Sequence, residues 1–174
     1  MIVGNSFSGI VVELGFATVI RNNQIDDNGK KMSGGVHGYQ IVIQVSEESD
    51  VFANTITQSA TSGGGIVIEF AQRQSARYTR NNYIHHNIIH AYPDKISAEL
   101  YCYAKDLTPE AQDNFFTKDK NRFDYNIYLV NKNDTPFKRK GEKLTLSQFR
   151  EFGQEAHGEL RAQNRINVTP ERRN

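Results

Sequence analysis

The residues whose types suggest chemistry gather between positions 69 and 103. Two carboxylates, Glu69 and Glu99, share this stretch with several histidine, arginine, lysine and tyrosine side chains. Paired carboxyl groups can act as general acid and general base, whereas a cation with a nearby base can remove a proton from carbon next to a carboxylate. The catalytic set that we predict is Glu69, Glu99, His86, Lys95 and Tyr101, and the binding set is Arg73, Tyr103 and Tyr128.

These residues lie on or beside segments in which apolar residues alternate, a pattern that predicts β-strands. The segments cover residues 9–13, 38–45, 65–70, 97–102 and 124–130. In the third segment Ile66, Ile68 and Phe70 should point to one side and Glu69 to the other. The same count places Glu13, Gln40, Gln44, Glu99, Tyr101, Tyr103 and Tyr128 outward and Cys102 inward.

A second pattern repeats between the strands: an asparagine followed, two positions later, by an apolar residue. It occurs at Asn5, Asn23, Asn54, Asn82 and Asn114, with irregular steps of 18, 31, 28 and 32 residues. Asparagine favours turns, but the shared apolar neighbour favours stacked, equivalent coils with the asparagines at their corners. An inward-pointing asparagine would satisfy backbone polar groups and the asparagine of the next coil.

With these motifs the chain resembles the right-handed parallel β-helix superfamily of pectate-lyase-like proteins. The resemblance rests on Gly9-Ile10, on residues 65–68, and on residues 20–25 and 78–84, and it covers about residues 1–130. It implies an all-β solenoid of four to five coils in a secreted or cell-envelope, carbohydrate-active protein. Function would lie on outward-facing strand positions, because side chains fill the interior.

The C-terminal segment differs in charge and in pattern. Residues 1–130 hold 11 basic and 14 acidic residues, whereas residues 131–174 hold 10 and 6. Thr145 and Gln148 have the spacing of a capping box, and they predict a short helix over about 145–153 that covers the last coil. We therefore expect β-helix coils over 1–130, then a loop, a capping helix and an extended tail over 131–174.

Residues 144–157 resemble the C-terminal element of secreted bacterial β-helix proteins. The chain is thus expected to be the C-terminal portion of a longer carbohydrate-active protein. A coil begins within five residues of Met1, so we expect either further N-terminal coils or a self-associating partner to cover that end.

Composition excludes several classes of function. The 21 basic and 20 acidic residues among 174 give a net charge of +1, which offers no reason to expect a nucleic-acid partner. No run approaches the roughly 20 apolar residues of a membrane helix. The single cysteine excludes an internal disulfide and a multi-cysteine zinc site. The run of residues 138–140, Lys-Arg-Lys, is interpreted as a solvated loop, and no metal site is predicted.

Two functions remain open. The first is a polysaccharide lyase or glycoside hydrolase that acts on acidic or plant-type polysaccharide, with Ca²⁺ as the expected cofactor if the chain is a uronate lyase. The second is a non-catalytic β-helix module that binds glycan or forms a surface or adhesin stalk. A purely structural role at the end of a solenoid comes third, since fold alone does not decide function.

Overall fold

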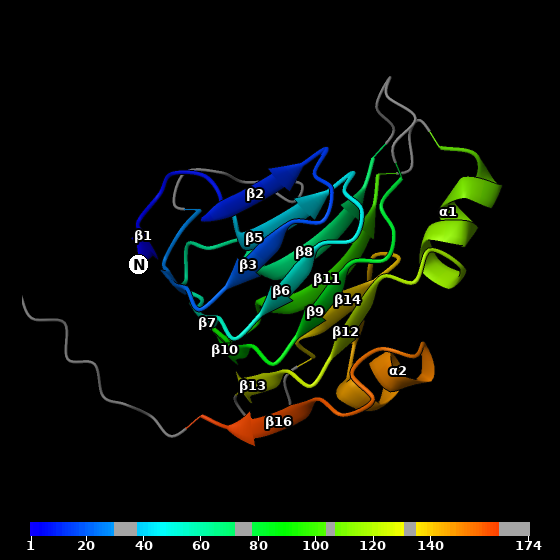
Figure 1. The fold of residues 1–174 in the computed structure, drawn as a ribbon. Coiled ribbons are helices and arrows are strands. Elements are labelled where there is room, and N and C mark those ends of the chain that lie inside the picture. Colours follow the sequence, from blue (N-terminus) through cyan, green and yellow to red (C-terminus); the bar gives the residue numbers. More distant parts are fainter. Residues whose placement is uncertain (30–37, 72–77, 104–106, 131–134, 164–174) are drawn as a thin grey trace, which may run out of the picture.

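The strands of this protein fall into three sheets that receive one strand each in turn. The computed structural model describes residues 1–29, 38–71, 78–103, 107–130 and 135–163. From β2 to β14 the chain passes repeatedly through the same order of sheets, so that every third strand lies in the same sheet (Figure 1).

We number the sheets in the order in which the chain enters them after β1. Sheet 1 contains β2 (Ile10–Glu13), β5 (Tyr39–Gln44), β8 (Gly64–Phe70), β11 (Ile96–Cys102), β14 (Phe137–Arg139) and β15 (Glu142–Leu144). Sheet 2 contains β3 (Val19–Arg21), β6 (Asp50–Phe52), β9 (Tyr83–His85) and β12 (Arg122–Asp124). Sheet 3 contains β1 (Ile2–Val3), β4 (Gln24–Asp26), β7 (Thr55–Thr57), β10 (Ile88–His90), β13 (Ile127–Val130) and β16 (Glu159–Ala162).

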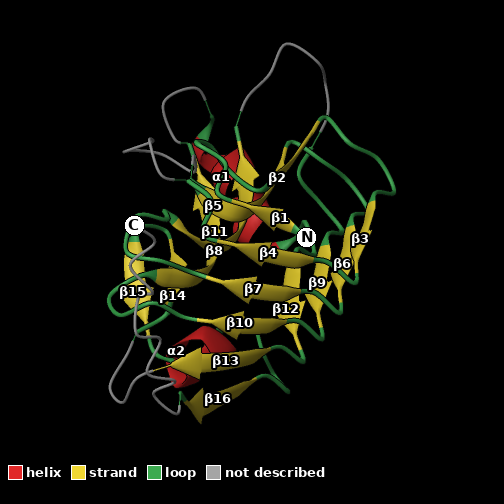
Figure 2. Cartoon of the chain, turned by 90° about the vertical axis from the view of Figure 1, so that its left-hand side faces the viewer, coloured by secondary structure: helices red, strands yellow, loops and turns green. Residues whose placement is uncertain are grey.

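Parallel pairing dominates all three sheets. Within each sheet a strand pairs with the strand of the next repeat, and among the described strands only β14 and β15 pair antiparallel. Figure 2 shows the strands of sheet 3 stacked one above another, with those of sheet 2 in a second stack beside them. The protein is therefore mostly β, with parallel sheets, as the alternating segments predict. Three strands that follow residue 130 also belong to these sheets.

The core consists of columns of apolar side chains that are in register from strand to strand. In sheet 2 the column is Ile20, Val51, Ile84 and Phe123, and in sheet 3 it is Ile25, Ile56, Ile89 and Tyr128. All of these residues belong to one buried cluster, which also includes the inward side chains of sheet 1. Burial of such a column supplies most of the driving force for stacking the repeats.

Tyr128 corrects a prediction, because it was expected outward and is fully buried. The prediction counted residues 124–130 as one strand. In the structure Tyr125 takes a left-handed backbone conformation (φ 57°) and separates β12 from β13. The alternation restarts after that corner, so Tyr128 joins the inner column.

Asparagines form a ladder at the corner between sheets 2 and 3. Its rungs are Asn23, Asn54, Asn87 and Asn126, each joined to the next by hydrogen bonds of 2.9–3.0 Å from its backbone N–H and side-chain amide. The residue before each rung has a left-handed conformation, with φ between 52° and 57°. Two of these rungs, Asn23 and Asn54, are at equivalent corners as predicted.

The other two predicted rungs are at different places. Asn82 belongs to a second ladder, at the start of sheet 2, in which it accepts a hydrogen bond from Ser49 and donates one to Asn121. Asn114 lies on helix α1 (Pro109–Thr117) and in neither ladder. The helix forms there because Thr108 caps it and Pro109 occupies its first turn.

The second helix, α2 (Leu146–Glu151), lies where the capping box predicts it. Thr145 and Gln148 make both reciprocal bonds of the box, and Gly153 has a positive φ of 74° after the helix ends. Phe149 is fully buried and its ring contacts those of Phe123 and Phe137, at 6.1 and 4.8 Å between centroids. The helix thus covers the ends of the inner columns of sheets 1 and 2.

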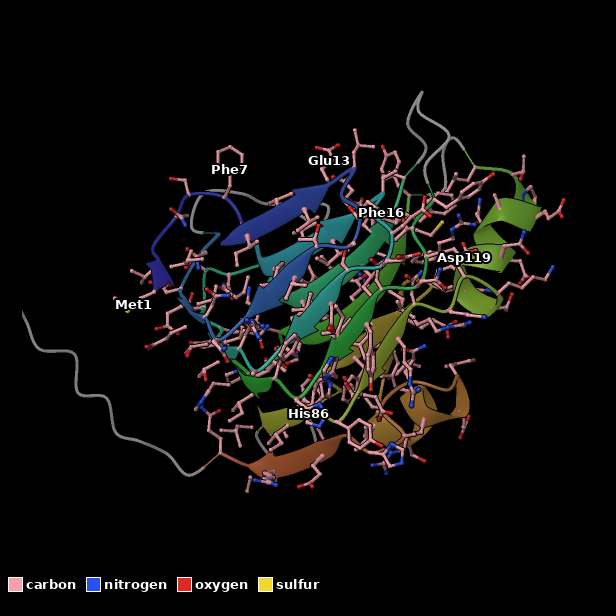
Figure 3. All side chains as sticks on the ribbon, in the orientation of Figure 1. Met1, Phe7, Glu13, Phe16, His86 and Asp119 are labelled. Atoms are coloured by element: carbon pink, nitrogen blue, oxygen red, sulfur yellow. The ribbon has the colours of Figure 1, made fainter. Side chains whose placement is uncertain are left out.

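The opposite end, formed by β1, β2 and the following turn, exposes apolar side chains. Met1, Phe7 and Phe16 are 83%, 57% and 62% exposed and project from the ribbon in Figure 3. The strands β1, β2 and β3 are the edge strands of their sheets at this end.

Candidate functional site

The outer face of sheet 1 carries two rows of side chains that run across the strands. One row consists of Glu13, Gln44, Glu69 and Tyr101, which are paired in register. The row beside it consists of Val11, Val42, Val67, Glu99 and Lys138. The intervening positions Ile68 and Leu100 point into the buried core, so the predicted outward parity of Glu69, Glu99 and Tyr101 agrees with the structure.

Glu99 is held between two partners from other strands. The phenol of Tyr39, on β5, donates a hydrogen bond to Glu99 Oε2, and the Nζ atom of Lys138, on β14, lies 3.0 Å from Oε1. The side chain of Glu99 is only 2% exposed. The hydrogen bond and the ion pair hold the Glu99 side chain in this sheltered position.

Tyr39 reaches Glu99 by crossing β8, where Gly64 makes room for its ring. A Cβ atom at Gly64 would overlap the ring atoms of Tyr39. The glycine is therefore required for the Tyr39–Glu99 contact, for reasons of space and not of backbone conformation.

The two tyrosines of this face are hydrogen-bond donors and not bases. Burial raises the pKa of Tyr39 far above its ordinary value, and the charge and hydrogen bond of Glu99 raise it further. Burial also raises the pKa of Tyr101, with added contributions from Glu69 and Glu99. Both phenols are consequently protonated near neutral pH.

Glu69 and Glu99 lie diagonally on neighbouring strands. Glu99 pairs with Val67, two residues before Glu69, whereas Glu69 pairs with Tyr101. A strand spacing of about 4.8 Å and a rise of about 3.3 Å per residue place the two Cα atoms about 8 Å apart. Both side chains leave the same face of the sheet, so their carboxyl groups lie on that face, at a separation set by the two side-chain conformations.

Tyr101 and Lys138 are the less buried members of this group of side chains. Lys138 Nζ lies 5.9 Å from the centroid of the Tyr101 ring, and the Lys138 side chain is 29% exposed. We call the set Tyr39, Glu69, Glu99, Tyr101 and Lys138 the acidic cluster.

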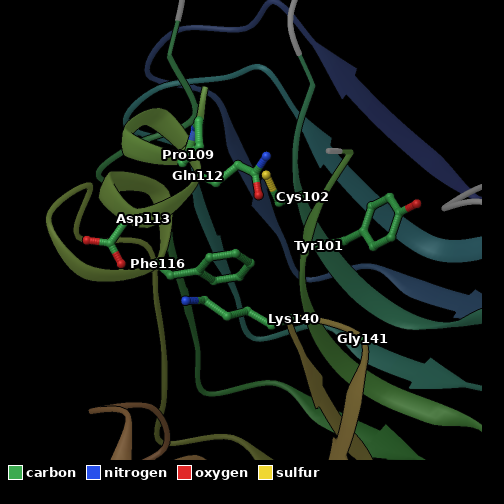
Figure 4. Close-up of a pocket in the computed structure, with 8 residues that line it drawn as sticks. All are labelled: Tyr101, Cys102, Pro109, Gln112, Asp113, Phe116, Lys140 and Gly141. Carbon is green, nitrogen blue, oxygen red and sulfur yellow. The ribbon is translucent and has the colours of Figure 1, made fainter. Parts of the chain in front are cut away.

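A pocket of about 470 Å³ lies beside β11, against helix α1 (Figure 4). Figure 4 shows Cys102 pointing toward Gln112 of α1, while Tyr101 points away to the other side of the strand. Burial, and then the charge of Glu69, raise the pKa of the Cys102 thiol to about 11. The thiol is thus un-ionised at neutral pH and a poor nucleophile.

The remaining predicted site residues lie apart from the acidic cluster. His86 is exposed at the corner between β9 and β10, and Tyr103 follows β11 and is 42% exposed. Lys95 precedes β11 and is four residues from Glu99, a distance of about 13 Å along an extended strand. Tyr128 is inside the core, and Arg73 lies outside the described residues.

Two members of the acidic cluster were not predicted. Lys138 was interpreted as part of a solvated loop, but residues 137–139 form β14 and place it in register with Glu99. Its neighbour Arg139 is 9% exposed and donates a hydrogen bond to the Phe116 carbonyl. In the sequence Phe137 is followed by three charged residues, so no alternation of apolar residues indicates a strand here. Tyr39 was not among the residues expected to face outward.

Comparisons with protein-family models, with curated proteins and with solved structures found no match. Within the part of the chain that the structure describes, no three histidine, cysteine or acidic residues come together as metal ligands. None of the described helices has the length and apolar character needed to cross a bilayer.

Proposed function

We propose that the three sheets form a right-handed parallel β-helix of the pectate-lyase-like kind and that the acidic cluster hydrolyses an acidic or plant-type polysaccharide, in a secreted or cell-envelope setting. The strand order supports the first part, since each turn of the chain adds one parallel strand to every sheet. The asparagine ladder at the corner between sheets 2 and 3 supports it as well.

The observation that carries the enzymatic proposal is the placement of Glu69 and Glu99 diagonally on one face of neighbouring strands, with their Cα atoms about 8 Å apart. Inverting glycoside hydrolases hold two carboxyl groups about 6.5–9.5 Å apart so that a water molecule fits between one of them and the sugar. Retaining enzymes hold the two carboxyl groups about 5–5.5 Å apart, so the anomer that forms first distinguishes the two mechanisms.

Glu99 is assigned the role of general base because Lys138 and Tyr39 hold its side chain in place. Its carboxylate takes a proton from water while the water oxygen attacks the anomeric carbon. Glu69 donates its proton to the departing glycosidic oxygen, so that the bond to the leaving sugar breaks. Afterwards Glu99 is protonated and Glu69 ionised, and exchange with solvent restores the starting state.

Hydrolysis is favoured over β-elimination by the residues available as bases. A lyase needs a base beside its substrate, and both Tyr39 and Tyr101 have raised pKa values that keep them protonated. His86, the other predicted base, lies at the corner between β9 and β10, and Lys95, the predicted cation, precedes β11. Lys138 and Tyr101, the less buried members of the cluster, would receive the carboxylate and the ring of an acidic sugar.

The test is an assay of the purified chain on pectate, alginate, glycosaminoglycans and neutral plant polysaccharides. We expect new reducing ends without unsaturated-uronate absorbance, and a product whose first-formed anomer is inverted. Glu69→Gln and Glu99→Gln should each lower the rate by about 10²–10⁴-fold. Glu151→Gln, an exposed carboxylate at the end of α2, is the matched control and should leave the rate unchanged. Unsaturated products, or full activity in both glutamine variants, would contradict the proposal.

The near-complete burial of both carboxylates favours a second candidate, a non-catalytic glycan-binding or adhesin module. In that case the acidic cluster stabilises the sheet, and the polysaccharide binds without being cut. Saturable binding of a polysaccharide that remains intact after prolonged incubation would support this candidate over the enzyme.

A further inference from the structure

The outer face of sheet 2 presents charged and aromatic side chains that the acidic cluster does not use. Each strand of this sheet has three residues, so its first and third side chains point outward. In register these outward pairs are Val19 and Arg21, Asp50 and Phe52, Tyr83 and His85, and Arg122 and Asp124.

An open groove of about 720 Å³ lies at the β3 and β6 end of this face. Its lining consists of Val19, Arg21, Asn23, Asp50 and Phe52. Val19 is 58% exposed, and Phe52 has Arg21 over one side at 6.0 Å and the His85 ring stacked on the other at 5.2 Å. Val19 and the edge of Phe52 therefore supply an apolar floor, and the other three residues supply a polar rim.

The rim offers donors and acceptors that the protein holds in place. Asn23 donates from Nδ2 to the Arg21 carbonyl and to Asn54 Oδ1, both at 3.0 Å, which fixes its amide. In the later rungs of the ladder Oδ1 accepts from the preceding asparagine, but no described residue donates to Asn23 Oδ1. It is consequently an oriented acceptor at the groove.

Asp50 is oriented by a chain of two histidines. Its Oδ1 lies 2.8 Å from His85 Nε2, and His85 Nδ1 lies 2.7 Å from His86 Nδ1. If His85 donates from Nε2 to the carboxylate, its Nδ1 carries a lone pair and accepts from His86 Nδ1–H. The Asp50 side chain is 44% exposed, so it can still accept from a ligand.

The corner between β9 and β10 makes this chain of contacts. Adjacent histidines on a straight strand would point to opposite sides, but His86 has a left-handed backbone (φ 52°) that turns it back toward His85. Its ring stacks on Tyr125 at 5.0 Å, and Tyr125 stacks on His157 at 4.3 Å. The stack holds His86, and through it His85, in place.

We infer that the groove over β3 and β6 is a second binding site, for a carboxylated sugar chain. A pyranose ring presents an apolar patch surrounded by hydroxyl groups, which matches an apolar floor inside a rim of mixed donors and acceptors. Asp50 is already paired with His85, whereas Arg21 has no described carboxylate within ion-pair distance. Arg21 can therefore make a bidentate contact with a sugar carboxylate, while Asp50 accepts hydrogen bonds from sugar hydroxyl groups.

In this site Arg21, Asn23 and Asp50 contact the sugar, and His85 is a positioning residue that acts through Asp50. The site does not depend on hydrolysis at sheet 1. It would hold a second stretch of the same kind of acidic polysaccharide at a distance from the acidic cluster.

The test is titration of the full chain with a short galacturonic acid oligomer and, separately, with a neutral galactose oligomer of equal length. Calorimetry measures the affinity, and the side-chain amide NMR signals report on Asn23. We expect the acidic oligomer to bind more tightly and to shift the Asn23 amide signals. Arg21→Gln should weaken its binding at least tenfold. Arg161→Gln removes an equally exposed arginine from sheet 3 and should change nothing.

His85→Ala should also weaken binding, and His85→Gln, whose amide can donate to Asp50, should restore it in part. Equal affinity for the neutral oligomer, unchanged affinity in Arg21→Gln, or preferential binding of a single-stranded oligonucleotide would overturn the inference. The proposed hydrolase can fail independently: binding that survives in a chain without hydrolytic activity still supports this site.

Discussion

Glu155 accepts a hydrogen bond of 2.7 Å from the side-chain amide of Asn126, the last asparagine of the ladder. Its neighbour Gln154 lies at the end of the second ladder, where its side chain donates to the Asn121 carbonyl and accepts from the Phe123 backbone N–H. Two adjacent residues after α2 therefore end both ladders. Each replaces the asparagine that a further repeat would have supplied.

The protonation of Glu155 should make stability depend on pH. Burial raises the pKa of this carboxyl to about 7, in spite of the hydrogen bonds from Tyr128 and Asn126 that lower it. In the unfolded chain the carboxyl ionises at its ordinary value, so between about pH 4.5 and pH 7 the folded state binds more protons. The free energy of unfolding should thus decrease as the pH rises from about 4.5 to 7, by about 3 kcal/mol at most, and stay constant at higher pH.

Denaturant unfolding at a series of pH values, with wild type and Glu155→Gln, measures this effect. The variant should lose the decline between about pH 4.5 and pH 7, since glutamine does not titrate. Parallel curves for the two proteins would show that another group is responsible.

Removal of an inner rung should cost more than removal of the first. Asn87 is fully buried and donates to the Val51 and His85 carbonyls and to Asn126, while its Oδ1 accepts from Asn54. Asn87→Ala leaves several of these groups without partners, and we expect a loss of about 2–4 kcal/mol in the free energy of unfolding.

Asn23→Ala is the comparison for Asn87→Ala. Asn23 is at the partly exposed start of the ladder, where water can replace its contacts, so the loss should be about 1 kcal/mol. Equal losses at the two positions would mean that burial along the ladder does not set the strength of its rungs.

The sequence predicted the ladder but not the full set of its members. Hydrogen-bonded partners along both ladders are separated by similar steps, 33 and 39 residues around Asn82 and Asn87. The spacing along the sequence therefore does not show to which ladder an asparagine belongs. The insertion of α1 lengthens one repeat to 39 residues, and this allowed Asn114 to be mistaken for a rung.

Only the part of the site that depends on strand alternation could be predicted from the sequence. Alternation within β8 and β11 gave the outward direction of Glu69 and Glu99. The contact of Tyr39 with Glu99 depends on the register of three strands and on Gly64, and no local pattern contains that information. His86 was assigned to the same site, although the corner at φ 52° sends it to the face of sheet 2.

Gly64 should be intolerant of a side chain as long as Tyr39 is present. A Cβ atom there meets the Tyr39 ring, so Gly64→Ala should lower the free energy of unfolding by about 1–3 kcal/mol. In a Tyr39→Ala background the same substitution should cost much less, because the obstructing ring is gone. Unfolding of the four proteins of this double-mutant cycle gives the coupling. Additive effects would mean that the glycine matters for its backbone and not for this ring.

Glu99 and Lys138 should be strongly coupled in stability. Lys138→Met leaves a carboxylate that is 2% exposed without its cation, and we expect a loss of about 2–4 kcal/mol near neutral pH. Glu99→Gln removes the charge but keeps an acceptor for the Tyr39 phenol, so it should cost less than the lysine variant. In the double variant Glu99→Gln and Lys138→Met, most of the loss caused by the lysine substitution should disappear, because no charge remains buried.

Unfolding by urea at low and high salt measures these losses. The coupling should persist in high salt, since the buried pair is screened less than a surface pair. If Lys138→Met is as stable as wild type, the ion pair at 3.0 Å does not hold Glu99 in place. Lys138 would then not be the residue that positions Glu99 as a general base, even if the chain proved to be an active hydrolase.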